Sequence, residues 1–229
     1  MMTATKPNGF KTALRYLIPL LVIPALVMIG AFLFSAERYL IISLGVAVLS
    51  LLLFYTGIEE KKIGSRRMVL TAIFTALSVV GRFIPVFKPV TALTVIAAVY
   101  LGAESGFLVG SLSALISNIY FGQGTWTPFQ MLAWGLIGLF AGYLSAPLKK
   151  HRWALLCYGV LSGVFFSFVM DIWTVLWYNG GFSLELYLAA LVSAIPYTVV
   201  YAVSNFIFLF FLAKPMGQKL ERVKIKYGV

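Results

Sequence analysis

The side chains in this sequence best suited to chemistry are one acid and a cluster of amides and hydroxyls. Asp171 is the only acid inside a long apolar stretch. Gln123, Thr127 and Gln130 lie close together in a stretch that also contains glycines and a proline, which favour a fixed turn. Amides and hydroxyls both donate and accept hydrogen bonds. This stretch therefore predicts the binding of a neutral or mixed-polarity small molecule.

Catalytic chemistry fits the sequence poorly. A metal-dependent membrane transferase needs several acids near one face to hold a cation, whereas Glu59, Glu60, Glu104 and Glu221 are scattered. An intramembrane Ser-His protease needs a histidine within a span, and the single histidine, His151, lies in a basic loop. We therefore expect no enzymatic activity, no cofactor and no metal site.

The composition requires a membrane around most of the chain. Of the 229 residues, 61% are hydrophobic and only 11% are charged, whereas soluble domains are about a quarter charged. The net charge of +11 would indicate nucleic-acid binding in a soluble protein, but in a membrane protein it is typical of basic loops. We expect an all-α, polytopic integral membrane helix bundle that contacts lipid and binds no nucleic acid.

Apolar stretches divide the chain into eight expected crossings, since a helix needs about 20 such residues to span a bilayer. The charge-free run 105–148 contains the turn-forming stretch 122–128, so it is divided into two helices. Arg82 and Pro85 predict a bent or interfacial end for the third crossing. The expected crossings are 15–35, 38–57, 67–86, 90–103, 105–121, 129–147, 153–178 and 186–213.

Loop charges orient these crossings. Eight crossings place both termini on one side of the membrane. Of the 18 Lys and Arg residues, only Arg38, Arg82 and Lys88 fall on the other side. Because cytoplasmic loops are enriched in Lys and Arg, both termini are expected to be cytoplasmic. The basic side includes Lys6, Lys11, Arg15, Lys61, Lys62, Arg66, Arg67, Lys149, Lys150, Arg152, Lys214, Lys219, Arg222, Lys224 and Lys226.

Aromatic and polar side chains gather at the outer ends of the crossings. Aromatic residues at this depth also form the interfacial belt common in membrane proteins, so that interpretation stays open for each Trp and Tyr. For Asp171 we consider an ion pair with Arg82, a contact in a substrate cavity and a proton relay. The candidate substrate-binding residues are Arg82, Asn118, Tyr120, Gln123, Trp126, Thr127, Gln130, Trp134, Asp171 and Tyr178.

Small residues at a spacing of four allow helices to approach closely. Ala72 and Ala76 share one face of the third crossing, where they form a flat patch suited to docking another helix. Glycine pairs predict further tight packing within the bundle. These pairs are Gly106 with Gly110, Gly138 with Gly142, and Gly159 with Gly163.

These features together resemble the substrate-binding (S) component of energy-coupling factor (ECF) transporters. The shared order is a basic loop, a span with alanines at spacing four, a bent outer end with Arg and Pro, and a short span ending in Leu-Gly. The resemblance covers residues 67–213 and points to the cobalamin and corrinoid branch. The stretches that carry it are Pro89–Thr94, Gly106–Gly110 and Thr125–Met131.

The resemblance implies a six-helix S-component domain at 67–229, preceded by an extension at 1–66 with two additional transmembrane helices. It implies a binding cavity that faces outward and is closed by the loops 82–89, 119–130 and 178–186. The implied substrate is a vitamin, cobalamin or cobinamide, taken up through a bacterial cytoplasmic membrane.

The resemblance also implies partners. Ala72 and Ala76 would dock on a transmembrane scaffold subunit, the T component, which two cytoplasmic ATPase subunits drive. The chain contains no Gly-x4-Gly-Lys-Ser/Thr loop, so ATP hydrolysis would come from a partner. The alternatives are an S component for another vitamin such as riboflavin, a self-sufficient secondary transporter, and a scaffold or channel subunit.

Overall fold

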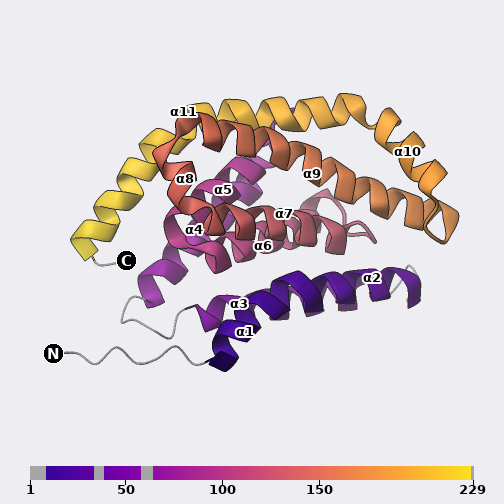
Figure 1. Ribbon diagram of the computed structural model, residues 1–229, viewed down its shortest axis with the longest axis horizontal. Helices are drawn as coiled ribbons and strands as arrows, with labels where there is room; N and C mark the ends of the chain where they lie inside the picture. The colour runs from indigo at the N-terminus through magenta and orange to yellow at the C-terminus, as the bar shows by residue number, and fades with distance from the viewer. Residues whose placement is uncertain (1–8, 34–38, 58–63, 228–229) are drawn as a thin grey trace.

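The computed structural model describes residues 9–33, 39–57 and 64–227. Within these ranges every regular element is a helix, which confirms the expected all-α membrane helix bundle (Figure 1). The residues used in the sequence analysis that lie outside the described ranges are Lys6, Arg38, Glu59, Glu60, Lys61 and Lys62.

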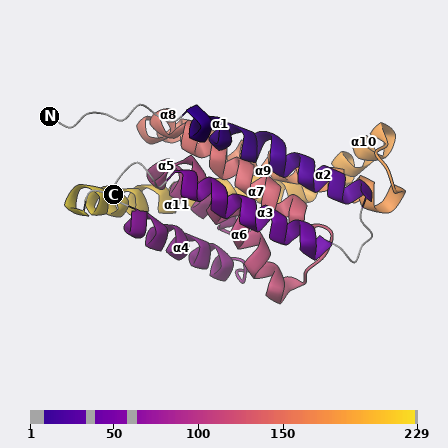
Figure 2. The ribbon, with the colours of Figure 1, turned by 90° about the horizontal axis from the view of Figure 1, so that it is seen from below.

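The first expected crossing is one continuous run of helix. It comprises α1 (Gly9–Leu17), the five-residue π-helical turn η1 (Ile18–Val22) and α2 (Ile23–Leu33). Pro19 opens the π turn, where its missing N–H interrupts the α-helical ladder. The next helix, α3 (Tyr39–Thr56), packs against α2, and the two lie side by side along the bundle (Figure 2).

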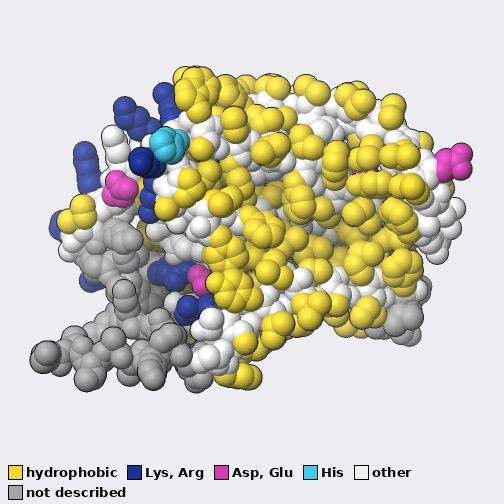
Figure 3. All heavy atoms as spheres, viewed as in Figure 1, with side chains coloured by type: hydrophobic (Ala, Val, Ile, Leu, Met, Phe, Trp, Pro, Cys, Tyr) yellow, Lys and Arg dark blue, Asp and Glu magenta, His cyan; other side chains and the backbone are white. Residues whose placement is uncertain are grey.

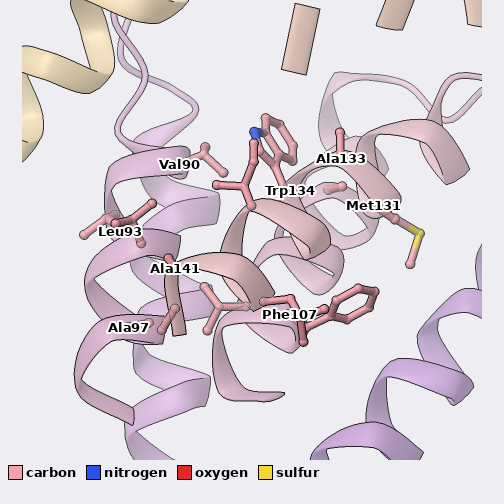
Figure 4. Close-up of a cluster of buried hydrophobic side chains, with 14 of the residues drawn as sticks. Val90, Leu93, Ala97, Phe107, Met131, Ala133, Trp134 and Ala141 are labelled. Atoms are coloured by element: carbon pink, nitrogen blue, oxygen red, sulfur yellow. The ribbon is translucent and has the colours of Figure 1, made fainter. Parts of the chain in front are cut away.

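Four helices form the middle of the molecule. They are α4 (Gly64–Gly81), α5 (Val90–Leu101), α6 (Ala103–Phe121) and α7 (Thr127–Tyr143). Helix α4 ends before Arg82, so the expected bent outer end is an irregular connection over residues 82–89. Helix α5 is buried on nearly all sides. Figure 4 shows Val90 of α5 pointing toward Trp134 of α7, and Phe107 of α6 belongs to the same buried cluster.

The remaining helices cover the face opposite α1–α3 (Figure 1). They are α8 (Ser145–Lys150), α9 (Arg152–Asn179), α10 (Leu184–Ser193) and α11 (Ile195–Tyr227). The expected last crossing, 186–213, is wrong as a single helix because the chain breaks at Ala194 between α10 and α11. Pro196, the second residue of α11, favours a helix start after Ala194, because proline suits a first turn, where its missing N–H costs no helical hydrogen bond. A second proline, Pro215, lies inside α11.

Within the described ranges, four helical stretches are long and apolar enough to cross a membrane, as expected of a membrane protein. The expected short crossing 90–103 is the short helix α5. The number of crossings, eight, stays a prediction. The four stretches are Gly9–Phe32, Tyr39–Thr56, Arg152–Asn179 and Ile195–Val223.

Charge is strongly polarised along the bundle. Lys and Arg side chains gather at the end where α1 begins and α11 ends, and apolar side chains cover the flank between the two ends (Figure 3). We call this the basic end and the other the outer end. At the basic end Arg67 donates to Glu104 at 2.9 Å and to the carbonyl of Gly57 at 3.3 Å. Arg15 also lies 3.8 Å from Glu104, so one carboxylate links α1, α4 and α6.

Helices α6 and α7 approach each other through their glycines. A Cβ atom on Gly106 would lie 2.7 Å from the carbonyl oxygen of Gly138, and one on Gly110 would overlap the carbonyl of Trp134. On α9, a Cβ on Gly163 would lie 2.7 Å from the amide nitrogen of Ala202 in α11. These contacts confirm the tight packing predicted from the glycine spacing, since no side chain can separate the backbones there.

We predict that Gly110→Ala destabilises the protein by roughly 1–3 kcal/mol, because the added methyl group forces α6 away from α7. The measurement is the midpoint of thermal unfolding in detergent. Gly181→Ala is the matched control, because nothing lies within 4 Å of a Cβ at that position. Equal midpoints for the two variants would contradict the packing argument.

Candidate functional site

A hydrogen-bond network at the outer end is centred on Asn118. This side chain is 1% exposed and lies near the end of α6. Its Nδ2 donates to Thr127 Oγ1 and to Gln130 Oε1, both at 2.9 Å. Its Oδ1 accepts from Arg82 Nη1 at 2.6 Å. One amide therefore joins the α4 end, α6 and the first turn of α7.

Arg82 is a buried cation held by neutral partners. Besides Asn118, its Nη1 donates to Ser117 Oγ at 2.5 Å. The guanidinium carbon lies 5.0 Å from the ring centre of Phe121 and 5.4 Å from that of Trp134, distances suited to cation–π attraction. Its Nε has no hydrogen-bond partner among the described residues. An unused buried donor is costly, so Arg82 Nε is a polar group that the described residues leave unsatisfied.

An aromatic wall continues from Arg82 across the bundle. Trp134 of α7 stacks on Phe166 of α9, with ring centres 4.8 Å apart and planes 16° apart. Phe166 meets Tyr201 of α11 edge to face at 5.2 Å. Three helices thus contribute rings to one aromatic cluster, in which Trp134 and Phe166 are buried.

Asp171 is a buried acid on α9, the helix that also carries Phe166. It is 8% exposed, and its Oδ2 has no hydrogen-bond partner in the described ranges. The expected ion pair with Arg82 is wrong: none joins the two described side chains, and Arg82 bonds to Ser117 and Asn118 instead. Arg82 Nε and Asp171 Oδ2 are thus a buried donor and a buried acceptor without hydrogen-bond partners among the described residues.

The turn between α6 and α7 is fixed by its own amides. Gln123 Nε2 donates to the carbonyl of Leu115 at 2.8 Å, and Gln123 Oε1 accepts from Thr127 Oγ1 at 3.1 Å. Trp126 packs edge to face on Trp173, whose Nε1 donates to Thr125 Oγ1 at 3.1 Å. Gln123 and Trp126 therefore hold the turn in place, while Asn118 donates to both Thr127 and Gln130.

Two of the candidate residues lie outside the network. Tyr120 is 72% exposed and packs on Phe83 and Phe121, and Tyr178 is 80% exposed near the end of α9. Both positions suit the interfacial aromatic belt. Sequence reasoning missed Ser117, Phe166 and Tyr201. Ser117 adjoins Asn118, but the two rings sit in apolar spans where nothing in the sequence separates them from lipid-facing residues.

The loop 82–89 covers the outer end beside the network. Val86 has a φ of 61°, which is uncommon for a β-branched residue and marks local strain. The Lys88 carbonyl accepts from Ser204 Oγ of α11 at 3.1 Å, so the loop is tied to the opposite layer. Burial lowers the pKa of the Lys88 amino group, and the Arg82 charge lowers it further.

Ala72 and Ala76 line an apolar groove away from this network. Both are exposed on α4, and the groove between α3, α4 and α6 encloses about 500 Å³. Its walls include Leu51 and Phe54 of α3 and Leu112 of α6. The two alanines lie on one face, as their spacing predicted.

We predict that Asn118→Ala destabilises the protein by about 1–3 kcal/mol, because Arg82, Thr127 and Gln130 all lose a buried partner. Asn205→Ala is the matched control, since Asn205 makes one bond, to the carbonyl of Gly159 at 3.0 Å. That loss is expected to cost about 0.6 kcal/mol. Thermal unfolding in detergent measures both, and a larger effect at Asn205 would argue against the central position of Asn118.

Comparison with known proteins gives one family. A search of curated proteins found no match, and a search of solved structures found none either. Residues 62–220, more than half of the chain, match the family described as the ECF-type riboflavin transporter, S component. The cobalamin branch is not confirmed by this match. The chain belongs to the S components of ECF transporters.

Proposed function

We propose that this chain captures a vitamin from outside the cell and releases it inward with the help of a T component and two ATPase subunits. Residues 67–229 would form the binding unit and 1–66 a two-helix extension, with both termini in the cytoplasm of a bacterial cell. The gathering of Lys and Arg at the basic end supports this orientation, because positive charge marks the cytoplasmic side. The subunit has no catalytic role in this proposal.

Riboflavin is the proposed substrate. The observation that carries this proposal is the aromatic wall of Trp134, Phe166 and Tyr201, with the unpartnered Arg82 Nε and Asp171 Oδ2 around it. The flavin ring is planar and carries both hydrogen-bond acceptors and an N–H donor. Binding would require Trp134 to part from Phe166, so that the flavin could stack on the freed ring faces and supply an acceptor to Arg82 and a donor to Asp171. The name of the matching family supports the same substrate.

Cobalamin or cobinamide is the second candidate. The sequence resemblance over Gly81–Leu144 favours a corrinoid, whose amide side chains would also suit the hydrogen-bonding groups of Asn118 and Gln130. A corrinoid is much larger than a flavin, so it would require the loop 82–89 and the turn 122–126 to open further. The two substrates are distinguished by direct binding.

We predict that the purified chain binds riboflavin in calorimetric titration, more tightly than cobalamin or cobinamide. Gln130→Ala should weaken riboflavin binding about tenfold, because it removes a partner of Asn118, the side chain that holds Arg82 for the flavin, and such a loss costs about 1–2 kcal/mol. Gln218→Ala is the matched control, because Gln218 is exposed on α11 at the basic end.

Three outcomes would count against this assignment. Tighter binding of cobalamin than of riboflavin would make the corrinoid the substrate. Equal loss of riboflavin affinity in Gln130→Ala and Gln218→Ala would show that the outer network is not part of the binding site. Accumulation of a vitamin in proteoliposomes that contain only this chain would indicate a self-sufficient transporter.

The groove that contains Ala72 and Ala76 is the proposed docking surface for the T component. Its floor carries small side chains, which let a partner helix approach closely. Its lining is almost entirely apolar, as a helix–helix contact within a membrane requires. The groove does not share residues with the outer network, so docking and vitamin binding can be separated by mutation.

We predict that Ala72→Trp combined with Ala76→Trp abolishes vitamin uptake by the assembled transporter, because two indole rings fill the groove. Vitamin binding to the isolated chain should be unchanged. The control is Leu161→Trp with Phe165→Trp, which adds bulk at the same spacing on the exposed face of α9. Loss of uptake in the control pair, or loss of binding in the alanine pair, would refute the docking role.

A further inference from the structure

A separate cavity of about 240 Å³ opens at the basic end between α5, the junction of α8 with α9, and α11. Four cations line it, with Glu221 as the one acid in its lining. The cationic residues are Lys149, Lys150, Arg152 and Lys214. No residue of the outer network lines this cavity, so the vitamin site does not account for it.

The cavity is charged at its rim and apolar at its floor. Lys150, Arg152 and Lys214 are exposed, whereas Ile96 and Leu209 at the floor are 1% exposed. The cationic rim suits the charged headgroup of an anionic amphiphile, and the buried apolar side chains beneath it suit the hydrocarbon part. A free inorganic anion would use the rim alone and gain nothing from the floor.

Two of the cations are held in position by aromatic rings. The Arg152 guanidinium carbon lies 4.0 Å from the ring centre of Phe210, and Arg152 Nη2 donates to the Phe210 carbonyl at 3.2 Å. Lys149 Nζ lies 4.8 Å from the ring centre of Tyr100. Because these side chains are already ordered, binding an anion would cost less conformational entropy.

The start of a long helix adds to the positive potential. Helix α9 begins at Arg152 and runs for 28 residues, and no side chain caps its first amide groups. Those N–H groups point out of the helix beside the cationic rim, where they favour a negative charge. The geometry thus combines a cavity, ordered cations and an uncapped helix start.

We propose that this cavity binds a phosphate ester anion, the headgroup of an anionic phospholipid, with the first carbons of an acyl chain on its apolar floor. Basic pockets between helices on the cytoplasmic side are suited to such headgroups. The bound lipid would connect α5, α9 and α11, three helices that already pack against one another.

The test is calorimetric titration of the purified full-length chain with a soluble short-chain lipid, dihexanoyl-phosphatidylglycerol. We expect saturable binding of this lipid, and little or none of dihexanoyl-phosphatidylcholine or inorganic phosphate. Lys150→Gln with Lys214→Gln should weaken phosphatidylglycerol binding about 30-fold, because each basic residue contributes about one kcal/mol.

The control pair is Lys219→Gln with Arg222→Gln, which removes the same charge from exposed positions of α11 outside the cavity. It should bind phosphatidylglycerol as the unmodified chain does. Equal weakening in both pairs would show diffuse attraction to basic charge and overturn the proposal. Equal affinity for inorganic phosphate would overturn the lipid assignment, and binding of a Glu-rich peptide without phosphatidylglycerol binding would indicate a protein partner instead.

Discussion

The outer half of this molecule depends on the contact between the backbones of α6 and α7. Gly106 faces Gly138, and Gly110 faces the carbonyl of Trp134, with no side chain between them. This contact brings the end of α6 against the first turn of α7. Asn118 can then bond to both Thr127 and Gln130 at 2.9 Å. A wider separation of the two helices would leave these buried polar groups unsatisfied, which is costly in a membrane.

The same contact explains how Arg82 can be buried without an acid. The charge is spread over hydrogen bonds to Ser117 and Asn118 and over two aromatic rings. Asp171 of α9, in contrast, keeps a buried oxygen without a hydrogen-bond partner among the described residues. Arg82 and Asp171 therefore form no ion pair with each other. A substrate with both donors and acceptors would supply the missing hydrogen-bond partners of Arg82 Nε and Asp171 Oδ2. Two side chains that formed a structural ion pair would need no such partners.

Much of the fold followed from the sequence because a membrane imposes a length on each apolar stretch. The division of 105–148 at its glycine-rich turn was correct, and so was the glycine packing. The pairing of Arg82 with Asp171 was wrong because depth in the membrane gives the height of a side chain and not its direction around the helix. Phe166 and Tyr201 were missed for a related reason, since an aromatic ring in an apolar span has no local sign of facing inward.

The position of α3 bears on the proposed docking of the T component. Leu51 and Phe54 of α3 form one wall of the groove whose floor holds Ala72 and Ala76. A helix seated in that groove would touch α3 as well as the docking face proposed on α4. Under the proposed docking, α3 would narrow the range of scaffold helices that fit, and removing it would change the surface that the partner contacts as well as shorten the chain.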